Sequence, residues 1–200
     1  MITTVLLDLD GVVRHFDPSH VALVERRHGL APGALMGAAF HPDLLEPAIT
    51  GQVSRAHWAE QVGKKVNNPE AATQWMAGRG TVDQEMLRFV DALRLAGTTV
   101  AILTNGTSTI PEEMEFLGLV PHFDAIFSSA EIGYAKPDER AFRAVCKSLA
   151  VAPSEVFFTD DTPSKLAGAI SLGMHATPFT NVEELRRQLI DLGVGAPKSR

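Results

Sequence analysis

Residues 3–13, with the sequence TTVLLDLDGVV, decide the fold and the site of this chain. An unbroken apolar run that ends in two carboxylates one residue apart is typical of a buried strand that delivers acids to a sheet edge. Because side chains alternate along a strand, Asp8 and Asp10 point to the same side. Like charges this close are tolerated when a cation or a shared proton balances them, so the stretch predicts a functional site. A hairpin turn at the Asp-Gly pair is the alternative, and the apolar residues around that pair disfavour it.

The chain has 200 residues, a formal net charge of -6 and 45% hydrophobic residues. This composition suits one globular domain with a small insertion. The negative charge argues against nucleic acid or an anionic membrane as the main partner, because both favour basic patches. No basic leader precedes the first strand and no apolar run is long enough to span a bilayer, so we expect a soluble, cytoplasmic protein. The single cysteine, Cys146, lies in an apolar helical pattern that predicts core packing.

Residues 17 to about 80 have a helical period and no convincing strand. The pattern predicts helices over 18–29, 32–40, 42–49, 54–62 and 69–77, most of them opened by Pro or Ser. Short helices with many breakers indicate a small separate bundle and not the crossover helices of a sheet.

From residue 82 onward, predicted helices alternate with predicted strands. The strands are expected at 99–104, 125–128, 156–159 and 174–177, and the helices at 82–95, 111–117, 138–149, 164–172 and 182–192. This alternation predicts an α/β fold with right-handed crossovers and a parallel sheet covered on both faces. Residues 195–200 are predicted to form a loose tail. Ligands bind beyond the carboxyl ends of such strands, where six polar residues lie: Asp8, Asp10, Thr104, Asn105, Asp160 and Asp161.

The acids at these strand ends can hold a hard divalent cation through oxygen, and Mg²⁺ pairs well with phosphate. A carboxylate attacks the phosphorus of a phosphate monoester only if their charge repulsion is neutralised, which a metal and a lysine would do. Asp8 would then displace the alcohol and form an aspartyl-phosphate. Asp10 would protonate the leaving oxygen and later activate water. The predicted ligand is therefore a small phosphorylated metabolite, with Mg²⁺ as cofactor.

Two shorter motifs offer groups for the phosphate. In the segment LTNG, residues 103–106, the Thr104 hydroxyl and the backbone N–H groups around Asn105 can hold phosphoryl oxygens. Lys136, in the segment GYAKPD, is a point charge able to bridge the phosphate and the Asp8 carboxylate. Alone, the first segment is more typical of a turn, and a Lys before Pro is more typical of a solvated side chain. Because both segments follow the acidic stretch at residues 3–13 in this order, phosphate binding is the favoured interpretation.

A fourth motif, FFTDDTPSKL at residues 157–166, carries Asp160 and Asp161. An Asp N-cap before the following helix is the alternative interpretation. In their order along the chain, the four motifs resemble those of the haloacid dehalogenase-like superfamily, whose members are mostly phosphatases. They look most like the subgroup with a small helical cap after the first strand, which includes sugar-phosphate phosphatases and the phosphatase-like domain of epoxide hydrolases.

The resemblance covers essentially the whole chain. It implies a Rossmann-like three-layer core at residues 1–15 and 82–200, with an all-helical cap at residues 16–81. It implies that Asp8 is the nucleophile and Asp10 the acid/base. The implied Mg²⁺ ligands are Asp8, the backbone carbonyl of Asp10, Asp161, and Asp160 either as a ligand or as support for the other ligands.

The chain departs from the subgroup at Lys165, where relatives often have Asn or Asp. A cation there would form an ion pair with Asp161 or compete with magnesium. In the cap, the glycine-containing loop at residues 50–54 is expected to face the site. For most other polar and aromatic residues of this region, a surface or packing role is the simpler explanation. The candidates among them to contact the leaving group are Arg14, His15, His41, Arg55, His57, Trp58, Lys64 and Lys65.

Three other functions remain open from the sequence. A haloacid dehalogenase uses the same nucleophile but needs neither Asp10 nor the acids at 160 and 161, so these residues argue against it. A sugar phosphomutase differs from a phosphatase only in its cap contacts. A non-catalytic binding protein of the same fold is disfavoured by the intact motifs. Monomer and homodimer both stay open.

Overall fold

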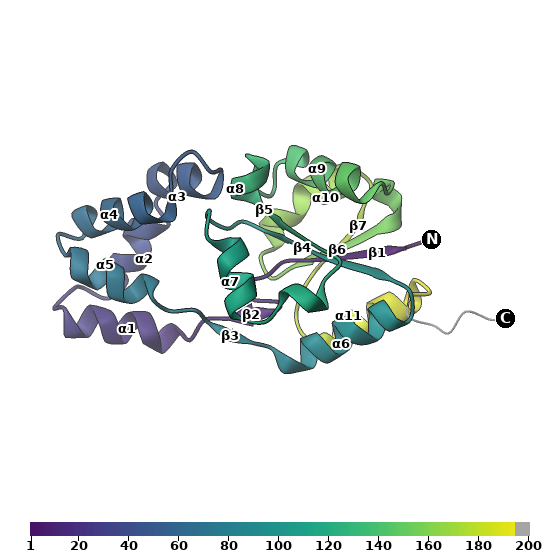
Figure 1. Ribbon diagram of the computed structural model, residues 1–200, viewed down its shortest axis with the longest axis horizontal. Helices are drawn as coiled ribbons and strands as arrows, with labels where there is room; N and C mark the ends of the chain where they lie inside the picture. Colours follow the sequence, from purple (N-terminus) through teal and green to yellow (C-terminus); the bar gives the residue numbers. More distant parts are fainter. Residues whose placement is uncertain (195–200) are drawn as a thin grey trace.

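The computed structural model describes residues 1–194, and the predicted tail at 195–200 lies outside the described residues. Its main sheet has five parallel strands in the order β5-β4-β1-β6-β7 (Figure 1). The strands are β1 (Thr4–Leu7), β4 (Thr99–Thr104), β5 (Ala125–Ser128), β6 (Val156–Asp160) and β7 (His175–Pro178). The predicted α/β class with a parallel sheet is confirmed.

Eleven α-helices occur in the described residues. They are α1 (Pro18–Arg27), α2 (Ala34–Ala39), α3 (Pro42–Ile49), α4 (Arg55–Lys65), α5 (Pro69–Met76), α6 (Gln84–Leu95), α7 (Ile110–Phe116), α8 (Ser129–Ile132), α9 (Glu139–Leu149), α10 (Ala167–Ser171) and α11 (Val182–Asp191). Short 3-10 turns lie at Val120–His122, Pro153–Glu155 and Pro163–Leu166. No helix within residues 1–194 is long and apolar enough to cross a bilayer.

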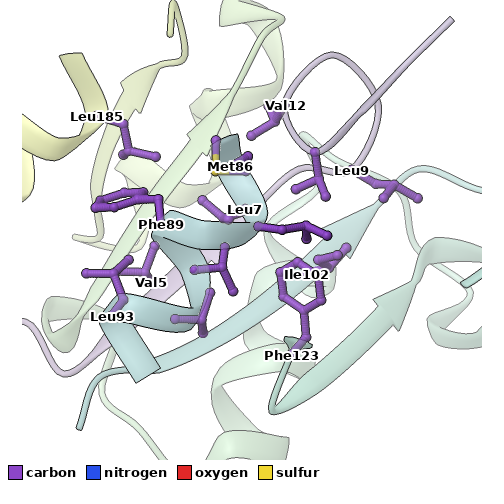
Figure 2. Close-up of a cluster of buried hydrophobic side chains, with 14 of the residues drawn as sticks. Val5, Leu7, Leu9, Val12, Met86, Phe89, Leu93, Ile102, Phe123 and Leu185 are labelled. Atoms are coloured by element: carbon purple, nitrogen blue, oxygen red, sulfur yellow. The ribbon is translucent and has the colours of Figure 1, made fainter. Parts of the chain in front are cut away.

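Alternation along the central strand β1 builds the core on both faces of the sheet. Val5 and Leu7 enter one apolar cluster, in which Phe89 of α6 and Leu185 of α11 also lie (Figure 2). Leu6 points the other way, into a cluster with side chains of α9 and α10. Helices therefore cover both faces, which gives the predicted three-layer, Rossmann-like arrangement.

The helical insert, residues 16–81, packs around an apolar cluster of its own. This cluster draws only on side chains between Val21 and Met76. Trp58 is buried in it and meets the Trp75 ring edge-on, with 6.0 Å between the ring centroids. In Figure 1 helices α1 to α5 lie together on one side of the sheet. The insert therefore has the separate helical core that the sequence pattern predicts.

One short ladder joins the insert to the core. β2 (Arg14–His15) pairs antiparallel with β3 (Thr81–Val82) where the chain leaves the core and returns to it. The sequence predicts a helix from residue 82, but Val82 belongs to β3 and α6 begins at Gln84, so that boundary was wrong. The two short strands were not predicted. Strands of two residues are too short to produce a recognisable period-2 pattern.

Candidate active site

Three neighbouring strands bring the predicted site residues to one edge of the sheet. Asp8 follows β1, Thr104 ends β4 and Asp160 ends β6, and β4 and β6 both pair with β1. All three side chains are buried. The carboxyl ends of adjacent parallel strands meet at the same sheet edge, so residues about 50 to 150 positions apart become neighbours.

Lys136 holds two of these acids together. Its Nζ forms an ion pair with Asp8 Oδ1 at 2.8 Å and donates to Asp160 Oδ2 and to the carbonyl of Leu103, both at 2.7 Å. The side chain is fully buried. The sequence predicts that this lysine bridges the phosphate and Asp8. In the structure Lys136 contacts Asp8, Asp160 and the Leu103 carbonyl, so it balances the charge of both buried carboxylates, and its contact with phosphate stays a prediction.

Asn105 positions this lysine. Its side-chain amide donates to the Lys136 carbonyl and its Oδ1 accepts from the Lys136 N–H, both at 2.8 Å. The sequence predicts that the backbone N–H groups around Asn105 bind phosphate, and this stays a prediction because the side chain binds the Lys136 backbone and leaves the Asn105 N–H for that role. Sequence reasoning missed this pairing because the partners are 31 residues apart.

The outer oxygen of Asp8 fits a bound cation. Asp8 Oδ2 is buried and has no hydrogen-bond partner within residues 1–194, which is costly for a carboxylate. One oxygen from each of Asp8, Asp160 and Asp161 can lie within 4.8 Å of the others. Burial raises the pKa of Asp8 despite the nearby ammonium of Lys136. A cation at this cluster would favour the ionised carboxylate, and all-oxygen ligands suit Mg²⁺.

Gly11 makes room for the third acid of this cluster. Its backbone has φ +86°, and a Cβ placed on it would lie 2.1 Å from Asp161 Oδ2. Any larger residue would therefore displace that carboxylate as well as strain the backbone. This contact explains why Gly directly follows the two acids of the first motif.

Lys165 lies at the same cluster. Its Nζ is 3.6 Å from both Asp8 Oδ2 and Asp160 Oδ1, and its side chain is 28% exposed. The expected ion pair with Asp161 is absent from the ion pairs of the described residues, and the ammonium faces the two buried acids. Although burial lowers it, the pKa of Lys165 is raised on balance by Asp8 and Asp160. A positive charge thus approaches the place where a metal would bind.

Asp10 is held by an arginine from the same segment. Arg14 Nε donates to Asp10 Oδ1 at 2.6 Å and Nη2 donates to Oδ2 at 3.1 Å. Burial raises the pKa of Asp10, and Arg14 opposes that rise. A raised pKa suits an acid that must carry a proton before it donates one. Arg14 was a candidate to contact the leaving group, but it is buried and paired with Asp10 instead.

Glu113 of α7 lies beside the site, in contact with Arg14, and was not predicted from the sequence. Its Oε2 accepts from Arg14 Nη1 at 2.6 Å, and its Oε1 accepts from Arg55 Nη1 and from Thr109 Oγ1. Although burial opposes it, the pKa of Glu113 is lowered by hydrogen bonds from Arg14 and Thr109. No local sequence signal marks it, because its two arginine partners lie 58 and 99 residues away.

The loop at residues 50–54 contacts the core beside this site. Gly51 has φ +74°, and a Cβ placed on it would lie 2.1 Å from the Ala130 carbonyl of α8. The Arg55 N–H donates to Ser108 Oγ at 3.4 Å. Among the other candidates on the insert, Trp58 packs in the core of the insert, whereas His57 is half-exposed and Lys64 pairs with Glu60 on the surface.

The chain is similar in sequence to known hydrolases and phosphatases. The family model for haloacid dehalogenase-like hydrolases matches residues 2–173. The chain is 30% identical over 172 residues to acyl-CoA dehydrogenase family member 10 of Mus musculus, and the match covers 76% of this chain but only 16% of the mouse protein. It is 28% identical over 191 residues to phosphatase MT3486 of Mycobacterium tuberculosis, covering 88% of this chain and 86% of that protein.

A solved structure shows the same fold. It is a HAD family enzyme from Bacteroides thetaiotaomicron in complex with magnesium and inorganic phosphate, and it superposes with a TM-score of 0.77 at 19% identity over 94% of this chain and 99% of that one. The family match over most of the sequence, together with the acids and the lysine at the carboxyl ends of the strands, leads to one conclusion. This chain belongs to the haloacid dehalogenase-like hydrolase family.

Proposed function

We propose that this protein hydrolyses phosphate monoesters of small metabolites, with Mg²⁺ and through an aspartyl-phosphate intermediate. The observation that carries the proposal is the state of Asp8. One of its oxygens is fixed by Lys136, and the other is buried without a hydrogen-bond partner in residues 1–194. Such an oxygen is suited to attack or to metal binding once the repulsion of the phosphate is neutralised.

The residues divide the reaction into two steps. An Asp8 oxygen attacks phosphorus, the bond from phosphorus to the ester oxygen breaks, and Asp10 gives its proton to the departing alcohol. Asp10 then accepts a proton from water, which attacks phosphorus and releases inorganic phosphate, so that Asp8 is regenerated. Thr104 and backbone N–H groups after β4 would hold the phosphoryl oxygens. Lys136 keeps the charge of the two buried acids balanced throughout.

Mg²⁺, when bound, would neutralise phosphoryl charge and orient the ester. Asp8, the backbone carbonyl of Asp10 and Asp161 would hold it, with Asp160 as a further ligand or a support. The relative named as a phosphatase and the solved relative with magnesium and phosphate support this assignment. Asp10 and the pair at 160 and 161 have no use in a dehalogenase, so the phosphatase assignment explains more of the site.

We also propose that residues 16–81 act as a cap over a core formed by residues 1–15 and 82–200. The separate apolar cluster of the insert and the contact of Gly51 with α8 support this division. Substrate choice would then depend on the loop at 50–54. The net charge of -6 favours a small substrate over nucleic acid, and we expect the protein to act in the cytoplasm.

A panel of phosphate esters tests the function. Release of inorganic phosphate is measured from sugar phosphates, nucleoside monophosphates, phosphoserine and p-nitrophenyl phosphate, with Mg²⁺ and with excess chelator. We expect hydrolysis of at least one ester, loss of that activity in chelator and recovery when Mg²⁺ is restored. Asp8→Asn, which keeps the size of the side chain, should be inactive with Mg²⁺. Full activity in chelator would refute the metal requirement, and full activity of Asp8→Asn would refute the nucleophile.

A further inference from the structure

A chain of ion pairs runs from Asp10 to the helical insert. Arg14 binds Asp10 with two donors and Glu113 with a third. Glu113 in turn accepts from Arg55, the first residue of α4. Four charged side chains, Asp10, Arg14, Glu113 and Arg55, thus form one network, of which the proposed mechanism uses only Asp10.

Arg14 is placed to act through Asp10 and not on the substrate. Its side chain is only 3% exposed, whereas that of Asp10 is 42% exposed. A guanidinium that binds both carboxylate oxygens fixes the plane of the carboxylate as well as its position. The Arg14 backbone is itself fixed, because its N–H donates to the Leu9 carbonyl and its carbonyl accepts from Gly11, both at 2.8 Å.

The other end of the network belongs to the insert. Arg55 Nη2 donates to the Met76 carbonyl at 2.7 Å, so the guanidinium also touches the last residue of α5. Arg55 Nη1 meets Thr109 Oγ1 at 3.3 Å beside its contact with Glu113. The insert is therefore connected to α7 by the same carboxylate that supports Arg14, and movement of α4 would remove one of the partners of Glu113.

We propose that Arg14 is the positioning residue for the Asp10 carboxylate, and that Glu113 and Arg55 make this positioning depend on the seating of α4 against the core. This inference rests on the proposed function, because it takes Asp10 as the acid/base. It adds a link between the insert and proton transfer. If the insert is displaced, Glu113 loses its contact with Arg55 and holds Arg14 less firmly. Substrate that enters in this state would meet a less well positioned Asp10.

The test compares two esters that differ in their need for a proton. The alcohol of an alkyl phosphate leaves as an unstable alkoxide unless it receives a proton, whereas the leaving group of p-nitrophenyl phosphate departs as the stable p-nitrophenolate. The value of kcat/KM reports the first step, in which this proton is given. We expect Arg14→Gln to lower kcat/KM for the alkyl ester by about 10- to 100-fold and for p-nitrophenyl phosphate by less than about 3-fold. Arg55→Gln should lower the ratio of kcat/KM for the alkyl ester to kcat/KM for p-nitrophenyl phosphate by about 3- to 10-fold.

Three controls separate positioning from folding. Arg94→Gln removes an arginine paired with Asp124 beside the start of β4, at the opposite end of the strand from the site, and should leave both values unchanged. Arg14→Lys keeps the charge but cannot donate to both Asp10 oxygens at once. It should therefore restore only part of the wild-type ratio of kcat/KM for the alkyl ester to kcat/KM for p-nitrophenyl phosphate. If Arg14→Gln does not fold, as judged from its thermal unfolding, Arg14→Lys and Arg55→Gln decide the matter.

The outcomes distinguish this inference from the proposed function. A wild type that hydrolyses neither ester overturns the function and the inference with it. An active wild type whose Arg14 variants lose both activities in equal proportion, or lose neither, overturns the inference alone. If Arg14→Gln selectively loses the alkyl ester while Arg55→Gln matches the wild type, the proposed dependence on the insert is wrong.

Discussion

At the scale of single residues, charge balance around Asp8 decides what the site can bind. Lys136 neutralises Asp8 and Asp160 from one side, and the other Asp8 oxygen has no hydrogen-bond partner within residues 1–194. Lys165 brings a second ammonium to within 3.6 Å of that oxygen. A metal at this cluster must therefore compete with a cation that belongs to the chain.

Replacing this lysine should strengthen metal binding. At a few ångströms, even a partly screened repulsion between Lys165 and a divalent cation is worth on the order of a kcal/mol. We expect Lys165→Asn to bind Mg²⁺ severalfold more tightly, as measured by calorimetric titration in the absence of substrate. Lys147→Asn, a change on the exposed face of α9, is the matched control and should bind as the wild type does. An unchanged Mg²⁺ affinity for Lys165→Asn would show that Lys165 does not tune the metal.

At the scale of elements, the contact between the loop at 50–54 and α8 decides how the insert sits on the core. The backbone at Gly51 approaches the Ala130 carbonyl so closely that a Cβ cannot fit, and its positive φ favours glycine. Arg55 follows directly in the chain and carries the ion pair with Glu113. The contact of the loop at 50–54 with α8 is therefore next to the ion pairs that lead from Arg55 to Asp10. We expect a change in this contact to affect those ion pairs.

A single methyl group at Gly51 should separate the insert from the core without unfolding either part. We expect Gly51→Ala to lower kcat/KM at least about 10-fold, because the loop must move away from α8, while the midpoint of thermal unfolding falls only slightly. Gly37→Ala is the control, since it lies inside α2 with nothing within 4 Å of the added Cβ. If Gly51→Ala and Gly37→Ala have the same activity, the seat of the loop is not needed for function.

At the scale of the whole molecule, the sequence predicted most of the sheet and little of the network. Long apolar runs such as 99–104 identify buried strands, and acids directly after them identify the functional edge. The contacts of Lys136 with Asp160 and of Glu113 with its two arginines could not be predicted, because these partners lie 24 to 99 residues away in the chain and depend on side-chain placement in the fold. The two-residue strands β2 and β3 were missed because they carry no periodic signal.

The central claim is that Asp8 carries the phosphoryl group, and trapping that species tests it most directly. Asp10→Asn should still transfer phosphate from p-nitrophenyl phosphate to Asp8, since this leaving group needs no proton, but it should fail to activate water. We predict that Asp10→Asn releases a burst of about one p-nitrophenolate per protein and that mass spectrometry of the quenched protein finds phosphate on the peptide that contains Asp8. Asp8→Asn should give neither signal. Rapid turnover by Asp10→Asn without a burst, and without phosphate on that peptide, would contradict the account.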